Sequence, residues 1–174
     1  MIIEQYGIAL KRLTADKIEL VRQWRNDPKI SKYMEFRQII TPEMQYEWFK
    51  KIDNDTNYYF LITVNEEEIG LINIRDIDFK KRTGEGGIFI YADKYLNSDI
   101  SFRSVLCLTD FAFDHLSLDY LTAHILSDNI RAIKYNKAIG YELQDGQESI
   151  YNQKYILTKE QYLKKKKIIK RLLE

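Results

Sequence analysis

One stretch, residues 127–142 (SDNIRAIKYNKAIGYE), constrains the fold of this chain more than any other. Asp128 or Asn129 can accept a hydrogen bond from a free N–H group of a first helical turn, as residues that begin helices do. Gly140 can adopt the left-handed conformation that closes many helices. The stretch therefore predicts a short helix that carries Tyr135 and leads directly into a strand.

The hydrophobic pattern before and after this stretch alternates between the two periods of strands and helices. Strands are expected at residues 8–13, 57–64, 68–78, 84–91, 120–126, 142–146 and 149–157, and helices at 14–27, 41–52, 102–116, 129–139 and 159–174. The strand, helix, strand order over 84–126 implies a parallel crossover. The sequence thus predicts one α/β domain, residues 1–158, with a central mixed sheet flanked by helices. A basic amphipathic helix follows at 159–174.

Composition narrows the class of protein. A chain of 174 residues can build a substantial core without disulfides or a structural metal. Cys107 is the only cysteine and is interpreted as a packed hydrophobe in a reducing, cytoplasmic protein. The net charge of +1 provides no field that attracts nucleic acid or an anionic membrane. The N-terminal residues resemble no signal peptide, and no apolar run approaches the length of a membrane span.

Two motifs together resemble those of the GNAT superfamily of N-acetyltransferases, over residues 8–157. The family pattern Asn-x-Arg-Ala-x-x-x-Tyr-x-x-x-Gly-Phe/Tyr is present as Asn129, Arg131, Ala132, Tyr135, Gly140 and Tyr141. The segment WRNDP at residues 24–28 is typical of the branch with ribosomal-protein acetyltransferases and acetyltransferases of nucleotide-linked amino sugars, including the pseudaminic acid pathway enzyme. Each motif also has a purely structural interpretation. The first could be a capped helix, and the second a core Trp with a solvated helix end.

The resemblance implies a fold and a reaction. In GNAT enzymes the strands corresponding to 84–91 and 120–126 separate, and the arm of acetyl-CoA lies between them. Tyr135 matches a residue that protonates the departing thiolate, and Glu85 one that takes the amine proton through water. Main-chain N–H groups of Ile88, Phe89 and Ile90 would polarise the thioester carbonyl. The structural alternatives are a packed Tyr135 and a solvated Glu85.

The loop expected to bind the coenzyme pyrophosphate departs from the family pattern of Arg or Gln, two variable residues, Gly, one variable residue, then Gly or Ala. Leu96, Asp99 and Ser101 occupy the three defining positions. Asp99 is expected to act as an N-cap, to compete for the N–H groups and to repel phosphate. Binding could instead use other polar and basic groups, namely Asn97, Ser98, Ser101, Arg103, Lys94 and Arg131. Otherwise the chain is a non-catalytic binding module with the same fold.

Asn129 matches a residue that contacts the pantetheine arm or the acceptor, although helix capping explains it equally well. On the acceptor side the resemblance implies substrate binding by Trp24, Arg25, Tyr33 and Trp48, with Phe36 and Arg37 nearby. The acceptor it implies is a small amine, most plausibly a nucleotide-linked amino sugar. A protein N-terminus is the alternative acceptor.

The two histidines, His115 and His124, complete no metal cluster or triad and are interpreted as structural, with His124 in a core strand. No metal is expected. The four lysines at 164–167 are expected to form a solvated face rather than a membrane or nucleic-acid attachment site. They precede an apolar stripe, which predicts a helix packed on the domain or on a second copy of the chain in a homodimer.

Overall fold

The computed structural model describes residues 1–173 and contains one eight-stranded mixed sheet in the order β1-β2-β3-β4-β5-β6-β8-β7. Its strands are β1 (Ile2–Gln5), β2 (Ile8–Arg12), β3 (Tyr58–Val64), β4 (Glu67–Asp78), β5 (Thr83–Ile90), β6 (Tyr120–Leu126), β7 (Glu142–Leu143) and β8 (Asn152–Thr158). The β5–β6 pair is parallel, and all other pairs are antiparallel. The predicted α/β fold with a mixed sheet is therefore confirmed.

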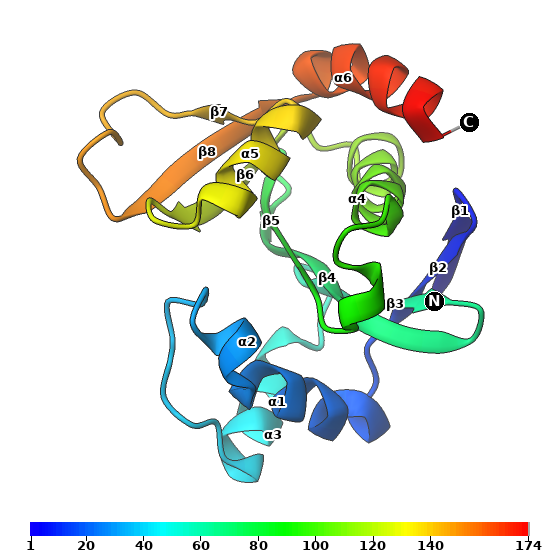
Figure 1. Cartoon of the computed structure of the whole chain (residues 1–174), viewed down its shortest axis with the longest axis vertical. Helices are drawn as coiled ribbons and strands as arrows, with labels where there is room; N and C mark the ends of the chain where they lie inside the picture. The colour runs from blue at the N-terminus through cyan, green and yellow to red at the C-terminus, as the bar shows by residue number, and fades with distance from the viewer. Residues whose placement is uncertain (174) are drawn as a thin grey trace.

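Helices cover both faces of the sheet (Figure 1). The helices are α1 (Ile18–Asn26), α2 (Pro28–Ser31), α3 (Pro42–Ile52), α4 (Ile100–Asp110), α5 (Ile130–Ile139) and α6 (Lys159–Leu173), with a π-helical turn at Phe111–His115 and short 3-10 turns at Ala15–Lys17 and Asp93–Tyr95. One hydrophobic cluster packs α1 and α3 against β3 and β4, and a larger one packs α4 and α6 against the opposite face. The face covered by α1 and α3 is called the acceptor face below, after the acceptor binding that the resemblance implies for its residues.

Most differences between expectation and structure occur at element ends. Strand β1 is not predicted from the sequence pattern, because Glu4 and Gln5 interrupt its apolar run. In the turn from β1 to β2, Tyr6 has φ 55° and Gly7 has φ 73°, which is the backbone conformation that two-residue hairpin turns prefer. Strand β7 ends at Leu143 rather than near residue 146, and β8 begins at Asn152 rather than at 149. Residue 174, the last of the predicted tail helix, lies outside the described residues.

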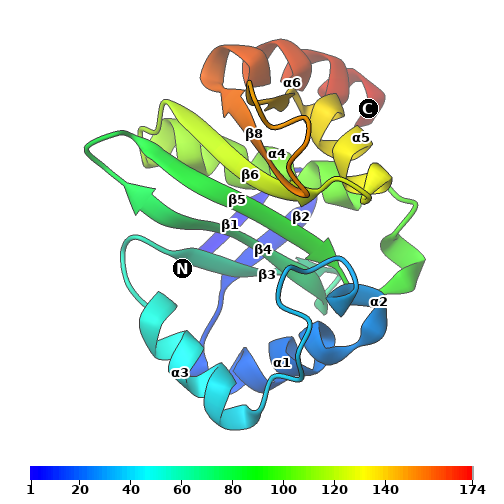
Figure 2. The same cartoon turned by 90° about the vertical axis from the view of Figure 1, so that its left-hand side faces the viewer.

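The pairing of β5 with β6 stops early, and this positions the site. Their parallel ladder runs from Thr83↔Tyr120 to Glu85↔Thr122 and no further. Beyond Glu85, β5 stays paired with β4, and β6 stays paired with β8. Figure 2 shows β5 and β6 separating toward their C-terminal ends. The expected opening between the two strands is therefore present.

Helix α6 packs on the domain through a buried polar cluster centred on Asp110 of α4. The Asp110 carboxylate accepts hydrogen bonds from the Tyr6 hydroxyl (2.6 Å) and the Tyr162 hydroxyl (2.7 Å). The Lys166 ammonium lies 2.6 Å from the same carboxylate. Burial, followed by the hydrogen bond to Asp110, raises the pKa of both tyrosines. One lysine of the 164–167 run thus faces inward, whereas the sequence predicts a solvated face.

Removing the Lys166 ammonium is expected to destabilise the domain. Lys166→Met should lower the free energy of unfolding by about 2 kcal/mol, because it removes a charge-assisted contact from a buried carboxylate. Lys167→Met is the matched control, since Lys167 is exposed and its loss should change the stability by less than about 0.5 kcal/mol. Urea denaturation of both variants measures the difference. Equal losses would contradict an anchoring role for Lys166.

Among the described residues, none of the helices combines the length and the apolar character needed to span a membrane.

Candidate functional site

The opening between β5 and β6 is the candidate coenzyme cleft. Gly86, Gly87, Ile88 and Phe89 are all half-buried, although they belong to a central strand. Their main chain has no ladder partner on the side that faces β6. A chain of amide groups such as a pantetheine arm could complete this edge as a neighbouring strand would. The main chain at 88–90 lies along this unpaired edge, and its role in carbonyl polarisation stays a prediction.

Tyr135 lies beside this cleft because both ends of α5 are fixed. Asn129 Oδ1 accepts a hydrogen bond from the Ala132 N–H at 3.1 Å, and Gly140 ends the helix at φ 117°. The Tyr135 hydroxyl donates to the main-chain oxygen of Ser101 at 2.7 Å, and its ring lies 4.9 Å from that of Phe102. Burial raises its pKa, so the hydroxyl keeps its proton until a stronger acceptor is present.

Tyr141 is a second hydroxyl at the cleft, which the sequence analysis treats only as part of the motif. A Cβ atom added to Gly86 would lie 3.1 Å from the Tyr141 hydroxyl oxygen. The side chain is buried, which raises its pKa, and the Glu85 carboxylate raises it further. The absence of a side chain at residue 86 therefore makes room for this hydroxyl at the start of the cleft.

Glu85 is the last residue of β5 that pairs with β6, and its side chain is 17% exposed. Arg75 Nη2 lies 2.5 Å from Oε1, and His124 Nδ1 lies 3.1 Å from Oε2. The alternative of a freely solvated Glu85 is therefore wrong. The expectation of a core His124 is also wrong, because the side chain is 35% exposed. It projects to the acceptor face, and strand alternation alone could not say which face that would be.

A hollow of about 230 Å³ opens beside Glu85 on the acceptor face. Its walls include Thr83, Thr122, Tyr120 and Lys154, which come from β5, β6 and β8. These side chains share one face because Glu85 pairs with Thr122, and His124 pairs with Lys154. The hollow gives Glu85 contact with water.

The loop at 96–101 is built differently from expectation. The predicted N-cap bond of Asp99 is wrong, because its carboxylate makes no cap hydrogen bond and accepts instead from Arg103 Nε (2.9 Å) and Nη2 (2.7 Å). Asp99 still occupies the N-cap position, but Ser98, one residue earlier, supplies the side-chain hydrogen bond, since its Oγ accepts from the Ile100 N–H at 3.3 Å. An arginine four residues along the helix neutralises Asp99 by charge more effectively than two N–H groups could.

The basic residues near this loop divide into two groups: Arg103 and Lys94 pair with carboxylates, whereas Arg131 contacts a main-chain oxygen. Arg103 also donates to the main-chain oxygens of Tyr6 and Leu173, so it joins α4 to the first hairpin and to α6. Lys94 is paired with Glu67. Arg131 is exposed and donates to the main-chain oxygen of Leu96, which places its guanidinium against the loop. Of the predicted cationic groups, Arg131 therefore fits a phosphate best, and Asn97 is exposed beside it.

Coenzyme binding is expected to depend on Arg131 more than on Asp99. The native protein should bind acetyl-CoA with micromolar affinity, on the order of 8 kcal/mol. Arg131→Gln should weaken this binding tenfold or more, because one charge-assisted contact is lost. Asp99→Gly, the comparison variant, should bind at least as tightly as the native protein. Calorimetric titration measures all three, and binding found only in Asp99→Gly would contradict this account of the loop.

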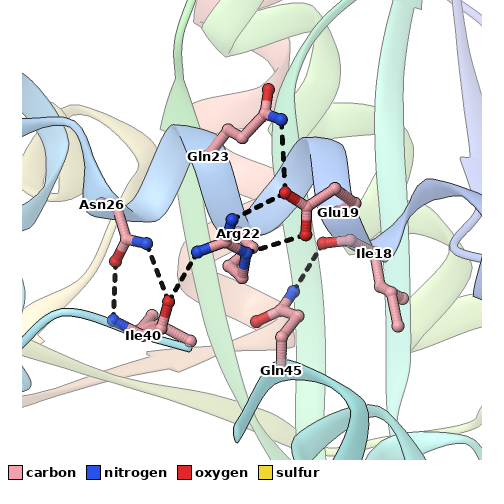
Figure 3. Close-up of polar contacts among 7 residues, drawn as sticks. All are labelled: Ile18, Glu19, Arg22, Gln23, Asn26, Ile40 and Gln45. Atoms are coloured by element: carbon pink, nitrogen blue, oxygen red, sulfur yellow. Dashed lines mark hydrogen bonds and ion pairs between the residues drawn. The ribbon is translucent and has the colours of Figure 1, made fainter. Parts of the chain in front are cut away.

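The segment at residues 24–26 forms the floor of the acceptor side. Trp24 is 5% exposed and stacks on Tyr91 at 5.3 Å, so it supports the site from within the core. The Asn26 amide donates to the Ile40 carbonyl (2.9 Å) and accepts from the Ile40 N–H (2.8 Å). Figure 3 shows Arg22 donating to the same carbonyl, and Gln45 of α3 donating to the Ile18 carbonyl. These bonds hold α1, the following loop and α3 together.

Arg25 points to the acceptor face between these elements. Its guanidinium carbon lies 5.4 Å from the centroid of the Trp48 ring, which itself packs edge-on against Tyr59 at 5.1 Å. Desolvation lowers the pKa of Arg25, the Tyr59 hydroxyl raises it, and the nearby Arg75 charge lowers it further. Within residues 1–173 its side chain has no hydrogen bond and no carboxylate partner.

The loop at 32–41 borders the acceptor face. Tyr33 is 51% exposed, so it lies at the surface of this border. Arg37 donates to the Tyr151 hydroxyl at 3.1 Å, and Tyr151 donates to Asp128 at 2.9 Å. These exposed bonds join the loop to the start of α5.

Cys107 is fully buried in α4, and burial raises the pKa of its thiol to about 12, which agrees with a packed rather than a nucleophilic cysteine. Within the part of the chain that the structure describes, no three His, Cys, Asp or Glu side chains gather as a metal site would require.

Comparisons with known proteins agree with this fold and cleft. The profile of the family described as "Acetyltransferase (GNAT) domain" matches residues 8–142, more than half of the chain. The matched family is one of acetyltransferases, and its solved relatives share the fold described above. The chain belongs to the GNAT acetyltransferase family. It is an N-acetyltransferase, and acetyl-CoA is its co-substrate.

Individual relatives add detail. Acetyltransferase PseH of Campylobacter jejuni is 27% identical over 87% of this chain and 92% of its own. A solved structure described as apo FdhC, a nucleotide-linked sugar GNAT, is 18% identical, covers 100% of this chain and 99% of its own, and has a TM-score of 0.82. Spermidine N-acetyltransferase of Vibrio cholerae, solved with CoA and spermine, is 18% identical, covers 91% and 99%, and has a TM-score of 0.79.

Proposed function

We propose that this enzyme transfers the acetyl group of acetyl-CoA to a primary amine of a nucleotide-linked amino sugar. The observation that carries this proposal is Arg25, a half-buried guanidinium on the acceptor face that has no anionic partner within residues 1–173. A desolvated charge is costly unless it is paired. The phosphates of a nucleotide would pair with Arg25, while Trp48 and Tyr59 offer aromatic surface to a base or sugar.

The same charge argues against a polyamine acceptor. Spermidine carries several ammonium groups, which would meet Arg25 and Arg75 on this face. Arg75 is neutralised by Glu85, but Arg25 is not. Repulsion between like charges selects against such ligands. The likeness to a spermidine acetyltransferase therefore supports the fold, whereas PseH and the nucleotide-linked sugar GNAT support the proposed acceptor class.

Acetyl-CoA supplies the acetyl group as an activated thioester when it is bound. The open edge of β5 would hold the pantetheine arm and donate N–H groups at 88–90 to the carbonyl oxygen, as an oxyanion hole does. Tyr135 would give its proton to the leaving sulfur, since a phenol suits a thiolate of similar basicity. Glu85 would help to remove the proton of the acceptor amine through water. Direct attack by the acceptor needs no nucleophile from the chain, and Cys107 is buried away from the cleft.

The test is an acceptor comparison that isolates the phosphate. Amino sugars linked to uridine diphosphate or thymidine diphosphate, each with a free primary amine, are compared with the same sugars lacking the nucleotide, and thiol release from acetyl-CoA is followed. We expect kcat/KM to be at least about tenfold higher for the nucleotide-linked sugars, because one charge-assisted contact is worth 1.5–3 kcal/mol, that is, about tenfold or more. Equal rates, or turnover only with a peptide N-terminus, would reject the proposed acceptor.

A further inference from the structure

The Glu85 carboxylate has a partner on each of its oxygens. Arg75 occupies Oε1 at 2.5 Å, and His124 Nδ1 faces Oε2 at 3.1 Å. The second ring nitrogen of His124, Nε2, has no hydrogen-bond partner within residues 1–173. Both carboxylate oxygens thus already face a nitrogen of a neighbouring side chain, whereas the imidazole offers a ring nitrogen with no such neighbour.

His124 also lies at the correct level of the cleft. Glu85 is opposite Thr122, so continuing this register by two residues brings His124 to the level of Gly87, just beyond the last paired residues. Side chains two residues apart on a strand share a face, so His124 and Glu85 both project to the acceptor face. Asn73 lies over Gly87 on this face, because a Cβ added to Gly87 would be 3.0 Å from its Oδ1. An amine approaching the carbonyl near residues 88–90 from this face would pass the imidazole.

We infer that His124 Nε2 accepts the proton of the acceptor ammonium, directly or through one water, and that Glu85 is the residue that positions the ring. This inference rests on the proposed function and refines the role of Glu85. In the neutral ring, the carboxylate beside Nδ1 favours the tautomer with its hydrogen on Nδ1, which leaves Nε2 as an acceptor. It also stabilises the imidazolium once the proton has arrived.

The surrounding charges are compatible with this role. The titratable or charged groups around the Glu85–His124 pair are Tyr59, Arg75, Asp76, Lys81, Tyr141 and Lys154. Arg75 is paired with Glu85 and Asp76, and Lys154 is the cross-strand neighbour of His124. Since the imidazole is 35% exposed, it can release the proton to water.

The protons and bonds balance. The ammonium loses one proton to His124 before the nitrogen attacks and a second proton after the C–N bond forms. The C–S bond breaks, and its electron pair leaves on sulfur, which receives one proton from Tyr135. Tyr135 recovers a proton from the nitrogen through water, and the imidazolium gives its proton to solvent. One proton is released per acetyl group transferred, and no oxidant or reductant is needed.

The test compares the two histidines of the chain. His124→Gln should lower kcat/KM about 10²- to 10⁴-fold with the fastest member of the acceptor panel, and should change the pH profile of kcat/KM. Binding of acetyl-CoA measured by calorimetry should be unchanged. His115→Gln is the matched control, because His115 is exposed on the π-helical turn and stacks on Phe111 at 5.8 Å. It should retain the native rate and pH profile.

Two further readouts separate a base from a structural residue. Imidazole added to His124→Ala should restore part of the rate, whereas it should not restore Glu85→Ala. Nitrogen NMR of the native protein should show the neutral His124 ring protonated at Nδ1, and an Nε2-protonated ring would overturn the inference. Native rate and pH profile in His124→Gln would also overturn it, while leaving the proposed function intact. A native protein that acetylates no amine would instead overturn the proposed function itself.

Discussion

Replacing Tyr135 by Phe is expected to lower kcat for acetyl transfer by about 10²- to 10⁴-fold, because the thiolate would then leave without a proton donor. The Tyr135 hydroxyl of α5 is held in place by its hydrogen bond to the Ser101 main-chain oxygen of α4, at 2.7 Å. The ring remains in Phe, so its packing at 4.9 Å from Phe102 is preserved. Losing the hydrogen bond to Ser101 should cost about 1 kcal/mol of stability, too little to unfold the domain. Stopped-flow measurement of thiol release gives kcat, and calorimetry should show unchanged acetyl-CoA binding.

Tyr141→Phe is the comparison variant, since it removes the other buried hydroxyl near the cleft. Its kcat should fall by less than tenfold if Tyr135 is the proton donor. The opposite ranking, with the large loss in Tyr141→Phe, would show that the donor is the hydroxyl next to Gly86.

Arg25→Met is expected to lower kcat/KM for a nucleotide-linked amino sugar by about 10- to 150-fold, because a charge-assisted contact with phosphate is worth 1.5–3 kcal/mol. For the same sugar without the nucleotide, the rate should change by less than about threefold, since no phosphate is present to lose its partner. Arg25→Lys should recover part of the difference, because a lysine retains the charge but not the planar fork. Steady-state kinetics with both acceptors measures the effect.

Lys50→Met provides the matched control on the neighbouring helix. The Lys50 ammonium lies 5.4 Å from the Tyr46 ring centroid, the same separation as Arg25 from Trp48, but both side chains are exposed. Its removal should leave kcat/KM unchanged for both acceptors. A uniform loss for both acceptors in Arg25→Met would indicate that Arg25 supports the fold of the acceptor side rather than a phosphate.

Much of the fold could be predicted because its elements have strong local causes. Thr41 and Pro42 begin α3 as expected, with Thr41 accepting from the Met44 N–H at 3.2 Å, and Gly140 ends α5 in the left-handed conformation. Strand β6 has the predicted bounds. Strand β1 could not be predicted, because it is a half-exposed edge strand that depends on pairing with β2.

The site was less predictable because it depends on contacts between distant segments. Alternation along β6 indicates that His124 and Thr122 share a face, but not which face the helices leave open. The position of Asp99 before a helix suggests capping, yet Arg103 four residues later is an equally local signal that could have predicted the observed ion pair. The solitary position of Arg25 depends on the packing of α3 beside α1, which no local pattern encodes.

The most direct test is a competition experiment with isotopically labelled acetyl-CoA. The native protein is given equal concentrations of a nucleotide-linked amino sugar, spermidine and a peptide with a free N-terminus, and mass spectrometry follows the label. We expect the label to accumulate first on the amine of the nucleotide-linked sugar, and Arg25→Met to lose this preference. Labelling of spermidine or the peptide in its place would contradict this expectation.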